Sequence, residues 1–177
     1  MKEDVIMKLY SLVVGSLQEN CYILVNEKNE ALVIDPGDEA EKIISFLQPY
    51  KVVGILVTHF HFDHVGALKQ LEDYYNVKAN KKVKEFNYVV LKTPGHTMDS
   101  ISFYFSNEKI MFVGDFIFSG GIGRIDLGGD NELMLASIKK TLEEIPDDTI
   151  LYPGHGDWTT LKNEKDYLEE IIKKEKL

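Results

Sequence analysis

The chain has 177 residues, of which 44% are hydrophobic and 28% charged, and its formal net charge is −9. This length favours a single domain over residues 1–177 with a sizeable buried core, and the composition is typical of a globular protein, not of a disordered one. The acidic balance argues against a nucleic-acid interface and against binding to an anionic membrane surface. Neither nucleic acid nor a membrane is therefore expected as a partner, and the sequence indicates no oligomeric state.

The cysteine content and the N-terminal residues bear on the cellular compartment. Cys21 is the only cysteine, so an intrachain disulfide framework is excluded, which fits a reducing compartment. The first residues have no apolar signal-peptide core, and no apolar run approaches the length of a membrane span. The sequence thus predicts a soluble, cytoplasmic protein. Because Cys21 begins an apolar run, its thiol is expected to be buried and inert.

The first part of the chain alternates apolar runs with turn-forming residues, which is typical of strands. Asp38 is predicted to be the N-cap of a helix that ends near Pro49. A second helix is expected over residues 65–75, where apolar side chains recur at helical spacing. The strands expected in this part cover residues 7–14, 21–26, 31–34 and 52–56.

The second part begins after residues 76–87, a lysine-rich segment without a clear pattern. Residues 119–129 are rich in glycine and are expected to form a long functional loop. Asp130 is predicted to cap a helix, and Thr160 or Asn163 to open a terminal helix from about residue 164. The expected strands cover residues 88–92, 101–105, 110–113 and 149–152. This order of elements suggests two layers of sheet with helices packed outside.

Three of the five histidines follow the expected strand over residues 52–56, within Val57-Thr58-His59-Phe60-His61-Phe62-Asp63-His64. In an extended backbone His59 and His61 leave the same face, and Asp63 would continue that parity. His64 breaks the parity and would turn inward from a loop. Three imidazoles and one carboxylate so close together indicate metal ligands.

The other two histidines, His96 and His155, each follow a Pro-Gly pair that comes after an apolar run. Pro-Gly marks a turn, so each of them is expected in a loop at the end of a strand. A core histidine is the ordinary alternative for any one of them, but five such positions together favour a metal site. Imidazole and carboxylate ligands suit zinc and also tolerate iron or manganese.

These residues, taken in order, resemble a known family. The set His59-x-His61-x-Asp63-His64, His96, Gly114-Asp115 and Gly154-His155 is similar to the motifs of the metallo-β-lactamase superfamily, and the match spans nearly the whole chain. The resemblance implies an α/β fold, a four-layer αββα sandwich with the metal site along one edge of the two sheets. An aspartate in place of a cysteine at position 115 resembles the hydroxyacylglutathione hydrolase (glyoxalase II) group.

The resemblance also implies two divalent metal ions, with zinc as the first choice and iron or manganese as alternatives. The implied ligands are His59, His61 and His96 for the first ion, Asp63, His64 and His155 for the second, and Asp115 between them with a bridging hydroxide. Water bound to such ions ionises near neutral pH. The implied reaction is the hydrolysis of a small thioester or ester, in which Asp63 orients the hydroxide or handles its proton.

Two further residues are candidates near the site. Asp35 ends a strand, and it either orients a ligand histidine or only forms the turn. Arg124 lies in the glycine-rich loop, where it either binds a substrate carboxylate or is tied to Asp126 or to a loop carbonyl. The glycines of this loop lack the spacing of a phosphate-binding P-loop.

Other functions remain open at this stage. Members of the same superfamily include mononuclear iron persulfide dioxygenases, and a lactonase or a β-lactamase is a further hydrolytic option. The presence of all seven candidate ligands favours the dinuclear hydrolase, acting on a small-molecule substrate. A metal-stabilised binding module is the third class, but structural zinc sites are closed and usually rich in cysteine.

Overall fold

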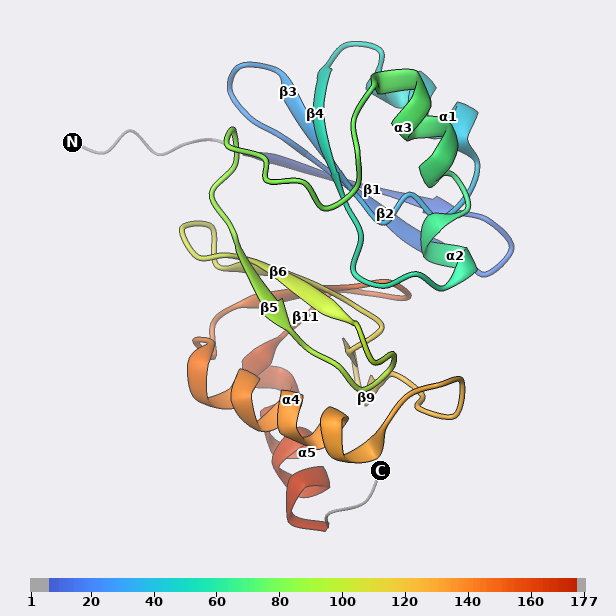
Figure 1. Ribbon diagram of the computed structural model, residues 1–177. Helices are drawn as coiled ribbons and strands as arrows, with labels where there is room; N and C mark the ends of the chain where they lie inside the picture. The colour runs from blue at the N-terminus through green and yellow to red at the C-terminus, as the bar shows by residue number, and fades with distance from the viewer. Residues whose placement is uncertain (1–6, 175–177) are drawn as a thin grey trace, which may run out of the picture. The chain divides into compact units, whose positions relative to one another are not determined.

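The computed structural model describes residues 7–174 (Figure 1). The chain divides into two compact units between Asn87 and Tyr88, here called the first and the second unit. A single domain over residues 1–177 stays a prediction, because the division into two units, each compact by itself, does not test it. Within residues 7–174, no helix combines the length and the apolar character that crossing a bilayer requires.

The first unit is a four-stranded sheet with helices on one face. Strands β1 to β3 pair antiparallel in sequence order, and β4 pairs parallel to β3 after the crossover helix α1. The elements are β1 Lys8–Val14, β2 Glu19–Val25, β3 Glu30–Ile34, α1 Ala40–Leu47, β4 Lys51–Leu56, α2 Phe62–Val65 and α3 Leu68–Tyr75.

Helices α1 and α3 cover one face of this sheet (Figure 1). Alternate residues of each strand point to that face, so Ile23 and Val33 pack with Ile43 of α1 and Leu71 of α3, and all four are completely buried. This packing places the end of β4 at a fixed position in the unit. The residues that follow β4 are the first histidine motif.

Three expectations for the first unit are wrong in detail. Asp38 is not the N-cap of α1, because the helix begins at Ala40 and Glu39 occupies the cap position with φ 50°. The carboxylate of Asp38 accepts a hydrogen bond from the Glu39 backbone N–H at 2.7 Å instead. The helix expected over residues 65–75 begins only at Leu68, as α3, and the separate short helix α2 ends at Val65. The strand parity assumed for Asp63 also fails, because Asp63 lies in α2.

The second unit is a five-stranded sheet in the order β11-β10-β7-β6-β5, with β7 and β10 parallel and the other pairs antiparallel. Helices α4 and α5 cover one face (Figure 1), where Met134 and Leu168 pack with Met111 and Leu151. The elements are β5 Val89–Lys92, β6 Ile101–Phe105, β7 Ile110–Gly114, β8 Ile117–Phe118, β9 Gly121–Ile122, α4 Asn131–Glu144, β10 Ile150–Pro153, β11 Thr159–Thr160 and α5 Leu161–Lys174.

Most expectations for the second unit are confirmed. The Asp130 carboxylate accepts from the Leu133 N–H at 2.8 Å and so caps α4. Helix α5 begins at Leu161, earlier than expected, and the Thr160 hydroxyl accepts from the Asn163 N–H at 3.2 Å. The glycine-rich segment 119–129 is only partly a loop, because its first residues belong to the β8–β9 hairpin.

Candidate metal centre

The first histidine motif begins where β4 ends, and a side chain from the unpatterned segment 76–87 holds that end in place. The Asn80 side chain accepts from the Val57 N–H at 2.8 Å and donates to the Val57 carbonyl at 3.1 Å. The Asn80 backbone N–H donates to the Ile55 carbonyl at 2.9 Å. Asn80 thus bonds both backbone groups of Val57, as a neighbouring strand would do. Val57 directly precedes Thr58 and His59, so these bonds hold the start of the histidine motif.

We predict that Asn80→Ala lowers the free energy of unfolding by about 1–2 kcal/mol, because it removes both side-chain bonds to the fully buried Val57. In a domain of this size the melting temperature should fall by roughly 2–8 °C. Asn76→Ala is the matched control, since Asn76 is likewise exposed and has positive φ (53° against 56°) but lies at the end of α3. Equal melting temperatures for the two variants would contradict the role given to Asn80.

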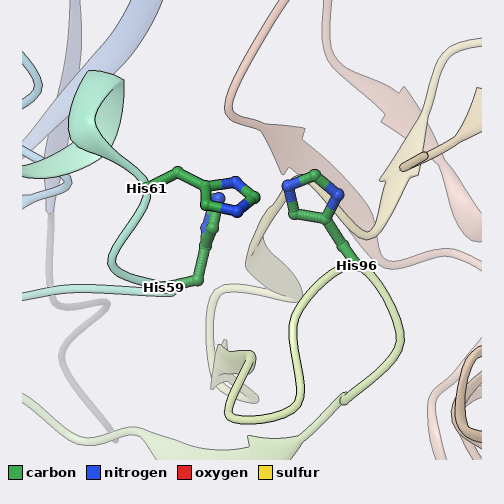
Figure 2. Close-up of side chains that lie close together, drawn as sticks. All are labelled: His59, His61 and His96. Atoms are coloured by element: carbon green, nitrogen blue, oxygen red, sulfur yellow. The ribbon is translucent and has the colours of Figure 1, made fainter. Parts of the chain in front are cut away.

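The three imidazoles of the first unit lie next to one another. The ring centroids of His59 and His61 are 4.8 Å apart with an interplanar angle of 78°, and Figure 2 shows the two rings as neighbours. The centroids of His59 and His64 are 4.1 Å apart. Asp63 projects from α2, and its Oδ2 is 3.8 Å from Nε2 of His64. All four candidate ligands of this unit are therefore brought together.

Asp35 connects two of these imidazoles to the end of β3. Its Oδ1 accepts from the Thr58 N–H at 2.7 Å, and its Oδ2 accepts from the Thr58 hydroxyl at 2.6 Å. The same Oδ2 is 3.0 Å from Nδ1 of His64. Asp35 is 2% exposed and has φ 50°, a conformation that Asp tolerates better than most residues. Asp35 therefore contacts His64 in addition to forming the turn.

These contacts determine which nitrogen of each ring carries the proton. A carboxylate only accepts, so Nδ1 of His64 must donate to Asp35. The single hydroxyl hydrogen of Thr58 goes to Asp35, so its 3.1 Å contact with Nδ1 of His59 makes that nitrogen the donor. When these rings are neutral, Nε2 carries the lone pair, which is an arrangement found in metal-binding histidines.

Glu19, which the sequence reasoning missed, is a second buried carboxylate beside His64. It is 1% exposed, and its Oε1 is 3.7 Å from Nδ1 of His64. A Cβ at Gly37 would lie 2.5 Å from Oε2 of Glu19 and 1.9 Å from the Asp63 carbonyl oxygen, so only glycine permits this close packing. A charged residue at the start of the apolar strand β2 was the signal that could have revealed it.

Cys21 lies two residues further along β2 and is completely buried. Burial, followed by the Coulombic effect of the Glu19 and Asp35 carboxylates, raises the pKa of its thiol well above the ordinary value. The thiol is therefore protonated at neutral pH and is a poor nucleophile. The prediction of a buried, inert cysteine is confirmed.

In the second unit, His96 lies in the loop between β5 and β6, and Figure 2 shows its imidazole projecting from that loop. Its Nδ1 is 2.6 Å from the Arg124 backbone carbonyl oxygen. Because a carbonyl only accepts, this nitrogen carries the proton and Nε2 has the lone pair. Nε2 of His96 is 3.5 Å from Oδ2 of Asp115.

Asp115 and His155 follow the parallel strands β7 and β10, whose carboxyl ends meet at one edge of the sheet. The Gly154 N–H donates to the Gly114 carbonyl at 2.9 Å and joins the two loops. Nε2 of His155 is 3.7 Å from Oδ2 of Asp115. One carboxylate oxygen of Asp115 thus faces two imidazole nitrogens, and the three candidate ligands of this unit are together.

Gly123 is required where the β8–β9 hairpin passes Asp115. A Cβ there would lie 1.7 Å from the Asp115 carbonyl oxygen and 3.2 Å from Cβ of His96. We predict that Gly123→Ala destabilises the protein by about 1–3 kcal/mol, because the clash is with backbone. Gly121→Ala is the control, since nothing lies within 4 Å of its Cβ position. Thermal unfolding of both variants checks this, and equal stabilities would contradict it.

The Arg124 side chain is tied to Asp126. Its Nε and Nη2 donate to Oδ1 and Oδ2 of Asp126, both at 2.6 Å, and both side chains are more than half exposed. The Arg124 guanidinium lowers the pKa of Asp126 to about 2. The tie to Asp126, which was one of the alternatives for this residue, is therefore present. The contact with His96 is made by the backbone carbonyl of Arg124, not by its side chain. A substrate-binding role for its side chain stays a prediction.

The sequence model of the metallo-beta-lactamase superfamily matches residues 14–88 and 81–155. The chain belongs to this superfamily. Among its relatives is hydroxyacylglutathione hydrolase GloC of Haemophilus influenzae, with 32% identity over 90% of this chain and 95% of that protein. The predicted α/β metallo-β-lactamase-like fold is confirmed, and so is the prediction of a metallo-hydrolase.

Two solved structures resemble this member of the superfamily along most of its length. BLEG-1, a B3 metallo-beta-lactamase, has a TM-score of 0.84 and 32% identity, and the match covers 90% of this chain and 97% of BLEG-1. TTHA1623 in a di-iron-bound form has a TM-score of 0.79 and 31% identity, covering 88% and 96% of the two chains. Metal binding is thus a property of the superfamily.

Proposed function

We propose that the chain hydrolyses a small thioester or ester, and that its two sets of ligands together bind two divalent metal ions, zinc being the first choice. The observation that carries the proposal is the orientation of three imidazoles. His59, His64 and His96 each have Nδ1 against a hydrogen-bond acceptor, which leaves Nε2 for a metal. The substrate is expected to be a small molecule, without nucleic acid or a membrane as a partner.

The donor set fits divalent ions. Five imidazoles and the carboxylates of Asp63 and Asp115 are ligands that zinc accepts and that iron or manganese tolerates. When bound, such ions polarise a substrate carbonyl and lower the pKa of a water molecule to about 7. The chain itself would hold the reacting groups in place: Asp35 and the Arg124 carbonyl orient two of the imidazoles.

Asp63 is the residue proposed to handle the proton. Its side chain is 14% exposed, so it is partly accessible to substrate and water. A carboxylate has two oxygens, so one can bind an ion while the other accepts a proton from the attacking water. The same proton can then pass from Asp63 to the departing thiolate or alkoxide.

A mononuclear iron persulfide dioxygenase is the second candidate, and the di-iron form of TTHA1623 favours iron as a metal to consider. Metal analysis of protein purified without added metal separates the two. We expect about two zinc ions per chain and hydrolysis of a thioester. The hydrolytic activity should be lost when a chelator removes the metal and should return when zinc is added. If the protein instead contains one iron ion per chain and consumes oxygen when a persulfide is added, it is a persulfide dioxygenase and the proposed hydrolysis is wrong.

A further inference from the structure

A cavity of ≈190 Å³ lies in the first unit beside the predicted ligand Asp63. It is bounded by the β1–β2 turn, by the turn at Gly37 and Asp38, and by α2. The apolar side chains that line it are Val14, Leu17 and Phe62. A cavity of about 150 Å³ holds a benzene molecule, so this one has room for a phenyl ring or a short alkyl chain.

Two of these side chains are unusually exposed for their type. Leu17 is 51% and Phe62 is 74% exposed. Single exposed apolar residues are ordinary, but two that line one cavity next to a predicted metal ligand indicate a binding surface. Phe62 directly precedes Asp63 in α2, so a group held by its ring lies beside the carboxylate that we propose handles the proton.

The β1–β2 turn that carries Leu17 is tied to the start of α1. The Gly15 N–H donates to Oε2 of Glu39 at 3.0 Å. The ammonium of Lys42 donates to the Val13 carbonyl at 2.7 Å and is 3.4 Å from the same Glu39 carboxylate. Leu17 is therefore presented on an anchored turn, which lowers the entropy cost of binding a ligand there.

The side chains that line the cavity offer no cation to an anionic group. Among the described residues that line it, the charged ones are Asp38 and Asp63, and none is Lys or Arg. Lys42, behind the turn, is already paired with Glu39. A carboxylate on the bound group would need a cation as partner and would meet carboxylates instead.

We propose that this cavity binds the acyl group of the substrate, and that the acyl group is uncharged and apolar, with the size of a phenyl ring or a six-carbon chain. This inference rests on the proposed thioester and ester hydrolysis and deepens it by naming the substrate class. The acyl group is bonded to the carbon that the water attacks, which places it beside Asp63.

The test uses the full, zinc-loaded chain and thioesters of N-acetylcysteamine, so that the leaving group is constant. The acyl groups are acetyl, hexanoyl, phenylacetyl and succinyl. The kcat/KM for hexanoyl and phenylacetyl is expected to exceed that for acetyl and succinyl about tenfold or more, because burial of the longer group stabilises its complex. A second series, with acetyl constant and phenylmethanethiol, also an alkyl thiol, in place of N-acetylcysteamine, tests whether the apolar site binds the leaving group instead.

Variants of the cavity should change the preference between acyl groups. Leu17→Ala and Phe62→Ala are each expected to lower the phenylacetyl-to-acetyl ratio severalfold, with metal content measured for both. Tyr74→Ala is the matched control, because Tyr74 is an exposed aromatic residue of the same unit on α3, outside the cavity. It should leave the ratio unchanged.

Binding can also be followed without turnover. Phenylacetamide, an uncharged analogue, is expected to shift the backbone amide signals of Gly15, Gly37 and Gly66, which line the cavity, and these shifts should be lost in Leu17→Ala. If zinc-loaded protein hydrolyses none of the thioesters, the proposed function is wrong. If it hydrolyses all of them equally, follows the thiol instead of the acyl group, or shows no shifts at these glycines, the acyl site is wrong.

Discussion

Asp115→Asn is expected to lower the hydrolytic kcat/KM on the order of 1,000-fold and to reduce the bound metal to fewer than two ions per chain. Oδ2 of Asp115 lies 3.5 Å from Nε2 of His96 and 3.7 Å from Nε2 of His155. Asparagine has the same shape but no charge, so it keeps the packing and weakens the ligand that faces both imidazoles. Metal analysis and thioester kinetics on the same preparation measure both effects.

Asp148→Asn is the control for this experiment. Asp148 is an exposed carboxylate of the same unit, paired with Lys109. Its replacement should change neither metal content nor activity, because an exposed ion pair contributes little. Two ions per chain and full activity in Asp115→Asn would show that Asp115 is not a metal ligand.

The second large effect is expected for Asp35→Asn. Asp35 accepts three hydrogen bonds, from the Thr58 N–H, the Thr58 hydroxyl and Nδ1 of His64. An amide has only one acceptor oxygen, so its NH₂ group would face at least one of these donors inside a buried site. Asparagine tolerates the φ of 50° at this position, so the backbone adds no separate strain.

Two measurements follow from this loss. Leaving a buried donor unsatisfied costs about 1–3 kcal/mol, which should lower the melting temperature by roughly 2–12 °C. If the proton of His64 moves to Nε2, the ring no longer offers a lone pair to the metal, and metal affinity should fall roughly 10–100-fold. Titration of the metal-free protein with cobalt, followed by the absorption of the bound ion, measures this affinity.

Asp73→Asn is the matched control, because Asp73 is exposed on α3 and paired with Lys69. It should change neither the melting temperature nor the cobalt titration. A normal cobalt titration of Asp35→Asn would mean that Asp35 only forms the turn after β3.

Much of the fold follows from local patterns in the sequence. Apolar runs, turn residues and the Asp130 cap predicted most strands and α4, because those signals act between residues that are close in the chain. The errors lie where a distant contact decides the local conformation. Helix α1 begins after Asp38 because Glu39 takes a left-handed conformation there, and its carboxylate binds Gly15 from another turn.

The ligand types of the candidate site were also readable. Five histidines at strand ends with nearby aspartates are an unusual composition for loops, and the chemistry of imidazole and carboxylate points to a divalent metal without any structure. The residues that contact those ligands could not be predicted from the sequence in the same way. Asn80 lies in a segment with no pattern, and Glu19 precedes the strand that was expected over residues 21–26.

The sequence by itself therefore determined the superfamily, the candidate ligands and the approximate order of the elements, since these depend on residue identity and spacing. Only the tertiary structure decided which nitrogen of three of the imidazoles faces a hydrogen-bond acceptor, because that depends on whether Asp35, Thr58 or the Arg124 carbonyl lies against the ring. Those partners are 28 or 29 residues away for His64 and His96. Hydrogen bonds between such distant residues form only after the chain has folded.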